Sequence, residues 1–562
     1  MSSLQRSGLS SSGALHVARH AVLVFFVFLL PTGSALAEFI PPEKMSKTLR
    51  KRIVVKEGGD DEGVPNGSID TFDPASIDAI RERWEHLQTT INRNYPFDPG
   101  PLQVSPGEVQ PWAPPTDTGF IRGADGIQLE VNGTPSAAVP NGFSSAVNEP
   151  SVAAVGDYVF YTANWFAAVS TDAGASWDYV NPFAGPFEEP AGQSFCCNQQ
   201  VHHDANSNTV FWLQQMIPTS STAAGTQRIN VDQDSNGTWD CFYDLTPQDA
   251  EFDNGTFPDY PDLSVSDRHL FVTSNVVTSE ANEFKGAFIA RAPLAEIASC
   301  SNAMVDLHTE TEFGSFRATQ GAGETMYFAT LESAASIRVW SWEENSAEPA
   351  AVSRSVNYFF SGARQCDDPS GVNWCGYVDS RLTGAAVSGN RAAFLWVAEE
   401  NPAGGFPFPY TQGVILDTSN DLAVLEQPLI WSNDAAWVYP SLAANSQGGF
   451  GGTVLWGGGT FFPRCSAFLI DRVNDHDWAP LEHEQVVNGL AGAGGDRSGD
   501  YLSTRAYAPN DKVYAGSCFA YPQEGVGESR YVLFGRQSDF LPNTIFEDGF
   551  ENGLGAWSSA TP

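Results

Sequence analysis

Hydrophobic and polar residues alternate in short runs from about residue 143 to residue 540. Four such runs are 158–161 (YVFY), 210–213 (VFWL), 270–273 (LFVT) and 393–396 (AFLW), and clusters of Gly, Asn, Asp and Pro separate them. Short alternating runs between turn-forming clusters are typical of half-buried β-strands. The pattern therefore predicts an all-β region over 143–540.

A recurring segment opens several of these runs. Its copies are 148–152 (NEPSV), 259–265 (DYPDLSV), 439–443 (YPSLA) and 499–503 (GDYLS). Successive copies are 111, 179 and 60 residues apart, measured between Pro150, Pro261, Pro440 and Asp500. These spacings are near two, three and one multiples of about 58 residues, a repeat length in the range of propeller blades.

Three further openers fill the gaps in this period, near residues 199, 319 and 379. There the sequences CCNQQVHHD, FRATQGAGE and GYVDSRL each precede an apolar strand. Seven units with about four strands each predict a seven-bladed β-propeller. The fourth and fifth openers are degenerate, so six or eight blades stay open. An array of β-sandwiches is the other alternative, but sandwiches do not need one opener repeated at this period.

The N-terminus has the features of a secretory precursor. Arg6 and Arg19 precede an apolar run at 21–30 (AVLVFFVFLL), and 35–37 (ALA) fits a signal-peptidase site. This run is too short for a bilayer, which takes roughly 20 residues. We expect 1–37 to be a signal peptide, with an uncleaved anchor as the alternative. Since no later segment is long and apolar enough to span a membrane, the mature protein is expected outside the cytoplasm.

Residues 38–142 are rich in Pro, Gly and Asp, and we interpret them as an extended N-terminal arm. One helix is expected near 74–94, because Asp73 can cap its first turn and Pro74 suits the first helical position. Its apolar face is formed by Ile77, Ile80, Trp84, Leu87 and Ile91. The arm either docks on the propeller or is a removable pro-segment. At the other end, the tail 541–562 contains FEDGFENG and is similar to short tails of exported bacterial proteins.

Net charge and cysteine content narrow the partners and the compartment. The chain carries a formal charge of −38, and losing 1–37 removes two arginines and no acid, which gives −40. Such a charge disfavours nucleic acid and other polyanions, so a neutral or cationic extracellular glycan or protein is the expected partner.

Eight cysteines in an exported chain predict disulfides. We expect Cys366 to pair with Cys375 across a polar loop, and one of Cys196 and Cys197 to pair with Cys241.

The octapeptide STDAGASW at 170–177 fits the pattern S-x-D-x-G-x-x-W, known as the Asp box. Asp172 can accept turn N–H groups, Gly174 tolerates positive φ, and Trp177 can pack beneath the turn, with Ser170 as the remaining position of the pattern. A degenerate copy, DQDSNGTW, lies 62 residues further on, about one blade away. In this box the chain resembles sialidase-like propellers with BNR repeats, in which the box is a structural turn.

The resemblance extends to secreted propellers without assigned activity. It is carried by NEPSVAA (148–154), FCCNQQV (195–201), FPDYPDLSV (257–265), RVWSWEE (338–344), SGDYLSTR (498–505) and YVLFGRQ (531–537). True sialidases imply six blades, an arginine triad and an F/Y-R-I-P motif. The segments 120–123 (FIRG) and 316–319 (FRAT) are poor substitutes for that motif. Sialidase activity is therefore not expected.

The second octapeptide also fits a calcium-binding loop. Its oxygen ligands would be Asp232, Asp234, Asn236 and Asp240, at spacings that suit Ca²⁺. Position twelve is Tyr243, which supplies no carboxylate, and a metal-free polar turn is the alternative. Calcium is the one cofactor that the sequence suggests.

The residues of the candidate site lie in the opener segments. If each opener begins the innermost strand of a blade, their polar side chains meet around the channel. These candidates are Glu149, Asp262, Asp379, Asp500, Tyr501 and Arg505, with Tyr260 and Tyr439 nearby. Paired carboxylates with tyrosines suit sugar binding, cation binding or general acid–base catalysis. The alternative is that opener residues brace neighbouring blades.

Two hypotheses for function follow. The first is a non-catalytic propeller that binds an extracellular glycan or protein. The second is a glycan-active enzyme, either a glycoside hydrolase or a polysaccharide lyase, that uses the opener carboxylates and tyrosines. The chain contains no GxSxG, HExxH, P-loop or Rossmann motif, and the missing arginine triad favours binding.

The neighbouring His202 and His203 point to opposite faces of a strand, so they are expected to be structural.

Overall fold

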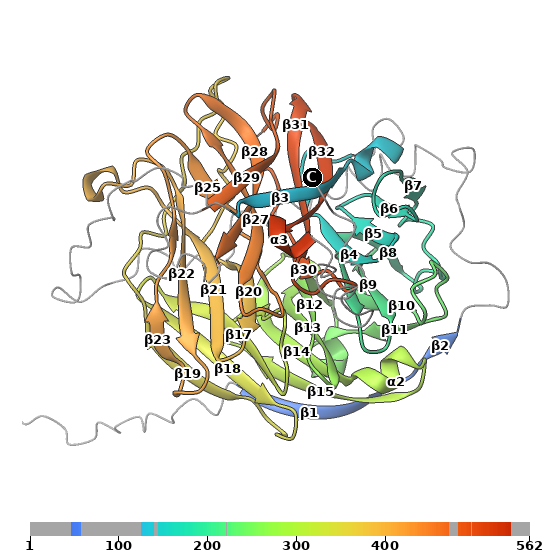
Figure 1. Ribbon diagram of the computed structural model, residues 1–562. Helices are drawn as coiled ribbons and strands as arrows, with labels where there is room; N and C mark the ends of the chain where they lie inside the picture. The colour runs from blue at the N-terminus through green and yellow to red at the C-terminus, as the bar shows by residue number, and fades with distance from the viewer. Residues whose placement is uncertain are drawn as a thin grey trace, which may run out of the picture. The chain divides into compact units, whose positions relative to one another are not determined.

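Seven antiparallel sheets, the blades, form the fold (Figure 1). This computed structural model describes residues 46–57, 125–139, 144–220, 222–470, 482–495 and 497–540. The predicted seven-bladed β-propeller is confirmed. The expected signal peptide, the expected helix near 74–94 and the C-terminal tail lie outside the described residues.

The first four blades follow one another along the chain. Blade 1 contains β4 (Ser151–Val155), β5 (Tyr158–Thr162), β6 (Ala167–Ser170) and β7 (Asp178–Val180). Blade 2 contains β8 (Gln193–Asp204), β9 (Thr209–Pro218), β10 (Thr226–Asp232) and β11 (Cys241–Leu245). Blade 3 contains β12 (Thr256–Val265), β13 (His269–Thr278), β14 (Phe284–Pro293) and β15 (Ala303–Glu310). Blade 4 contains β16 (Arg317–Ala318), β17 (Thr325–Ser333), β18 (Ser336–Glu343) and β19 (Ala350–Ser355).

Blades 5 to 7 complete the ring of sheets. Blade 5 contains β20 (Leu382–Ser388), β21 (Arg391–Ala398), β22 (Tyr410–Asp417), β23 (Ala423–Glu426) and β24 (Leu429–Ile430). Blade 6 contains β25 (Ala436–Val438), β26 (Ala443–Ala444), β27 (Phe450–Gly458), β28 (Phe461–Ile470) and β29 (Glu482–Val487). Blade 7 contains β30 (Thr504–Ala506), β31 (Tyr514–Gln523) and β32 (Val526–Arg536).

Three strands that precede residue 143 pair with these blades. β3 (Ile127–Gly133) adds the fourth strand to blade 7 by pairing with β32. β1 (Ser46–Ile53) pairs with β15 of blade 3, and β2 (Lys56–Glu57) pairs with β11 of blade 2. The blue strand β1 follows the edge of blade 3 in Figure 1. Hydrogen bonds from these N-terminal strands therefore cover the outer edges of three blades, where unpaired strand edges would otherwise be exposed.

The burial pattern explains why the strand signal is strong in some segments and weak in others. All ten residues of β9 are buried, because a middle strand lies between two neighbouring blades. In contrast, residues of the outermost β19 are exposed or half-buried throughout. Helices are short in the described ranges: α2 (Leu294–Ala298), α3 (Gln537–Phe540), η2 (Pro135–Ala138), η3 (Pro247–Ala250) and η4 (Pro402–Gly404). None of the helices in these ranges has the length and apolar character needed to cross a membrane.

All eight cysteines are paired in four disulfides. Cys366 is joined to Cys375, as the sequence predicts. The expected bond from Cys196 or Cys197 to Cys241 is wrong, because these two neighbours bond to each other and Cys241 bonds to Cys300. Cys241 begins β11, three strands away from β8, a separation of roughly 14 Å at the usual strand spacing. That is about twice the Cα separation that a disulfide spans.

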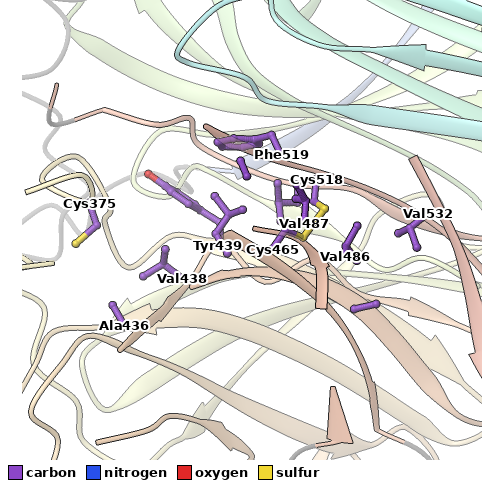
Figure 2. Packing of buried hydrophobic residues seen from close by; sticks show 14 of the residues in the cluster. Cys375, Ala436, Val438, Tyr439, Cys465, Val486, Val487, Cys518, Phe519 and Val532 are labelled. Carbon is purple, nitrogen blue, oxygen red and sulfur yellow. A yellow bond between two sulfur atoms is a disulfide. The ribbon is translucent and has the colours of Figure 1, made fainter. Parts of the chain in front are cut away.

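The fourth disulfide lies inside an apolar cluster between blades 6 and 7. Figure 2 shows Cys465 of β28 bonded to Cys518 of β31, beside Val486, Val487 and Phe519. Both cysteines are fully buried. The bond therefore links the sheets of two adjacent blades within their shared core.

Candidate functional site in the opener segments

The repeated opener of the sequence is a repeated bend of the backbone. Left-handed φ values of 48–54° occur at the opener residues Glu149, Asn198, Tyr260, Ser315 and Tyr439. Three of these residues, Glu149, Tyr260 and Tyr439, precede a proline, a position that normally favours extended backbone. Non-glycine residues at positive φ store strain that the surrounding structure must support. The bend thus sets how the chain enters the innermost strand of a blade.

Opener residues of three blades meet in one chain of ion pairs. Arg497 Nη2 lies 3.3 Å from Glu149 Oε1 and 3.0 Å from Asp500 Oδ2. Arg381 lies 2.6 Å from Asp379 through Nε and 3.5 Å from Asp500 through Nη2. We call these five residues the opener network. Three of the sequence candidates, Glu149, Asp379 and Asp500, are therefore brought together.

Of the two arginines in the opener network, Arg497 stands out in the sequence, because it belongs to a dense charged group with Asp500 and Arg505, whereas Arg381 was missed. Each lies two or three residues from an aspartate of an opener, in DSR for Arg381 and in RSGD for Arg497. That local signal was present, but the sequence does not show that one arginine contacts carboxylates of two different blades. A search for basic residues within three positions of each opener aspartate would have identified both arginines.

Solvent reaches part of the opener network. The side chain of Asp379 is 25% exposed and that of Asp500 is 16% exposed. Tyr377 is half-buried, with its ring centroid 6.0 Å from the guanidinium of Arg497. Glu149, in contrast, is buried. A ligand at this surface would therefore meet two aspartates and one aromatic ring.

Glu149 is a carboxylic acid whose pKa is strongly raised by its place in the network. Burial, and then the nearby Asp500, raise its pKa to about 8, although Arg497 opposes the shift. Glu149 is therefore mostly protonated at pH 7, and two carboxylates remain against two guanidinium groups. Because Glu149 and Asp500 contact the same Arg497 atom, their two oxygens lie at most about 6.3 Å apart, the sum of those contacts.

Three buried opener tyrosines interact with charged residues of the opener network, and we call them the tyrosine layer: Tyr260, Tyr439 and Tyr501. The ring of Tyr260 is 4.3 Å from Arg381 and 6.0 Å from Arg317, and the ring of Tyr501 is 5.7 Å from Arg317. Burial raises the pKa of Tyr260 to about 12 and also raises that of Tyr501 well above its usual value. Since these rings are buried, they are not available to stack on a sugar.

The other two candidates, Asp262 and Arg505, line a cavity further along the innermost strands, which we call the axial cavity. Its empty space is about 240 Å³, including the part open to solvent. Six blades line it, through Gln200, Asp262, Arg317, Gln320, Thr383, Ser441 and Arg505. Asp262 lies 3.1 Å from Arg317 and accepts a hydrogen bond of 3.0 Å from the Ala318 amide, so it braces blade 3 against blade 4.

The two octapeptides form hairpin turns. In the first, Asp172 accepts hydrogen bonds from Ser170 Oγ and from the Ser176 amide, both 2.8 Å, and Trp177 Nε1 donates to the Gly174 carbonyl. In the second, Asp232 accepts the amides of Asn236 and Gly237.

Calcium binding by Asp232, Asp234, Asn236 and Asp240 stays a prediction. Asp240 accepts the Gln233 amide, so this carboxylate and that of Asp232 already serve the turn. Within the described ranges, no group of three or more His, Cys, Asp or Glu side chains is arranged to hold a metal ion. A melting temperature that rises with calcium would support the prediction, and an unchanged one would reject it.

The adjacent histidines do not meet. His202 is buried, and burial together with nearby Arg505 lowers its pKa to about 3. His203 contacts Asn208 in the hairpin instead. The two rings therefore have separate surroundings, as alternation on a strand predicts.

No protein-family model and no curated protein match this chain. Solved structures show similarity at low identity. Cobalt-substituted Synechocystis ACO is 10% identical, with a TM-score of 0.35, over 59% of this chain and 70% of that chain. A PL25 ulvan lyase is 10% identical, with a TM-score of 0.29, over 59% and 82%. The SapL1 lectin in complex with alpha methyl fucoside is 8% identical, with a TM-score of 0.31, over 62% and 98%. Similarity at this level does not assign an activity to the chain.

Proposed function

We propose that this protein is an extracellular binding propeller whose opener network recognises a neutral glycan without cleaving it. The observation that carries the proposal is the charge-balanced chain of ion pairs, partly open to solvent beside Tyr377. Four disulfides support an oxidising, extracellular compartment.

The balance of charge favours a neutral ligand. With Glu149 protonated, the network presents two carboxylates and two guanidinium groups, which have no net charge. Sugar hydroxyl groups both donate and accept, so they suit carboxylate oxygens and guanidinium N–H groups held at fixed positions. An aromatic ring beside such groups provides an apolar face for a sugar ring. Tyr377 is the half-buried residue that meets this need.

The state of each carboxylate favours binding over cleavage. Asp379 and Asp500 are both held by arginines, and Glu149 is buried. A nucleophile or base has to approach the reacting atom within hydrogen-bond distance. Fixed, ion-paired side chains are better suited to holding a ligand than to attacking one.

A glycan array with the purified full-length protein, followed by calorimetry on the best neutral hit, tests the proposal. Asp379→Asn and Tyr377→Ala should each weaken binding by about tenfold or more, which is one lost hydrogen bond or stacking contact. Glu283→Gln removes an exposed charge that pairs with Lys285 and not with the opener network, so it should leave the affinity unchanged. If no neutral glycan binds, or if both Asp379→Asn and Tyr377→Ala bind like the wild type, the proposal fails.

One observation favours a glycan-active enzyme as the second candidate. Glu149 and Asp500 share Arg497, and the raised pKa of Glu149 leaves it protonated as a potential general acid. A reducing-sugar assay on the bound glycan separates the two functions. Cleavage that Glu149→Gln abolishes while binding persists would establish the enzyme. If wild-type protein releases no sugar ends, the binding function stands.

A further inference from the structure

The axial cavity contains more positive than negative charge. Arg317 and Arg505 both line it, whereas Asp262 is the single acidic residue among the described residues of its lining. All three side chains are more than nine-tenths buried. Asp262 is already paired with Arg317 at 3.1 Å, so one buried guanidinium remains without a counter-charge. An uncompensated buried charge costs several kcal/mol in a folded protein.

Arg505 is that guanidinium. It donates from Nη1 to the Thr504 carbonyl at 3.2 Å and from Nη2 to Gln200 Oε1 at 3.4 Å. Its Nε atom is buried and has no hydrogen-bond acceptor in the described part of the chain. No carboxylate in the described part of the chain forms an ion pair with Arg505. Both of its observed acceptors are neutral, so they do not offset its charge.

We propose that the axial cavity binds one small monovalent inorganic anion of halide size, held by Arg505 and Arg317. The site is separate from the site of the proposed glycan function, because none of the five residues of the opener network lines the cavity. The anion supplies the missing counter-charge and an acceptor for the Arg505 Nε–H group. The 240 Å³ of empty space includes the part open to solvent, and the enclosed part is close to the size of a single small ion, so a monatomic anion fits and a large organic anion does not.

The electrostatics around Arg505 agree with this assignment. Burial lowers its pKa to about 10, and the attraction of Asp262 is opposed by the repulsion of Arg317. The guanidinium is still protonated at neutral pH, so losing its proton does not remove the excess charge. His202 is neutral because burial and Arg505 lower its pKa, and it adds no charge of its own.

Thermal melting tests the proposal with chloride as the probe. Sodium gluconate is replaced stepwise by sodium chloride at constant ionic strength, because gluconate is too large for the cavity. The melting temperature of the full-length protein should rise by roughly a few degrees and then level off as the site fills. Arg505→Gln should abolish this saturable rise. Arg338→Gln, which removes a partly exposed arginine of β18, should retain it.

Equal melting curves in chloride and gluconate, or an equal rise in Arg505→Gln, would overturn the proposal. If Arg505→Gln does not fold, crystals of the wild-type protein grown in bromide provide the second test. An anomalous peak in the cavity, next to Arg505 Nε, supports the anion site. A cavity that holds only water in bromide refutes it.

Discussion

In the opener network three carboxylates share two guanidinium groups, whereas the axial cavity has two guanidinium groups and one carboxylate, which pairs with Arg317 alone. The first region has an excess of acid and the second an excess of base. Glutamic acid can remove its own charge by binding a proton, and Glu149 does so at neutral pH. Arginine keeps its proton, so Arg505 needs a counter-ion. The same pairing chemistry thus leads to a neutral surface in one region and an anion site in the other.

The largest effect should come from breaking the opener network at one of its two arginines. Arg381→Met leaves Asp379 without its guanidinium and removes one partner of Asp500, so we expect a loss of about 3–5 kcal/mol in the free energy of unfolding. Urea denaturation measures this loss. Arg338→Met, whose ion pair is about one-third exposed, should cost about 1 kcal/mol or less. Equal costs for the two variants would show that the network is not a stabilising unit.

The pH dependence of the free energy of unfolding should reveal the protonation of Glu149. The unfolded glutamate releases its proton near pH 4.5, whereas folded Glu149 keeps it up to about pH 8. The folded state therefore binds more protons in this window, and unfolding free energy should fall as pH rises, by about 1.4 kcal/mol per pH unit at most. Glu149→Gln should lose this part of the slope. Glu283→Gln, at an exposed position, should follow the wild-type profile; a variant Glu149→Gln with the wild-type slope would contradict the protonated state.

The smallest effect should come from the cavity when no halide is present. Arg505→Gln relieves the cost of a buried charge that no carboxylate pairs with, but it also loses two hydrogen bonds and leaves space in the cavity. These effects oppose each other, so the free energy of unfolding should change by about 1 kcal/mol or less in gluconate. In chloride the same substitution should be more costly, because the wild-type protein then gains from anion binding. A large cost that is equal in both salts would mean that Arg505 acts as a structural brace like Asp262.

The local sequence predicted features that depend on neighbouring residues. Alternation and turn residues indicated the strands, and the opener period gave seven blades. Cys366 and Cys375 are close in sequence, so their bond could be predicted. The convergence of Glu149, Asp379 and Asp500 also followed, because equivalent positions of repeated units come together around an axis. Cys241 could not be assigned in this way, since its partner Cys300 depends on how two blades pack.

The sequence by itself determined the repeat, the strands and the set of opener carboxylates. The tertiary structure decided which arginine meets which carboxylate, since Arg381 and Arg497 each contact residues that are distant along the chain. It also buried Tyr260, Tyr439 and Tyr501, separated Asp262 from the other acids, and left Arg505 without one. The physical reason is that pairing, burial and pKa depend on the distances between blades. A local pattern sets which side chains are present, and only the packing of the blades sets those distances.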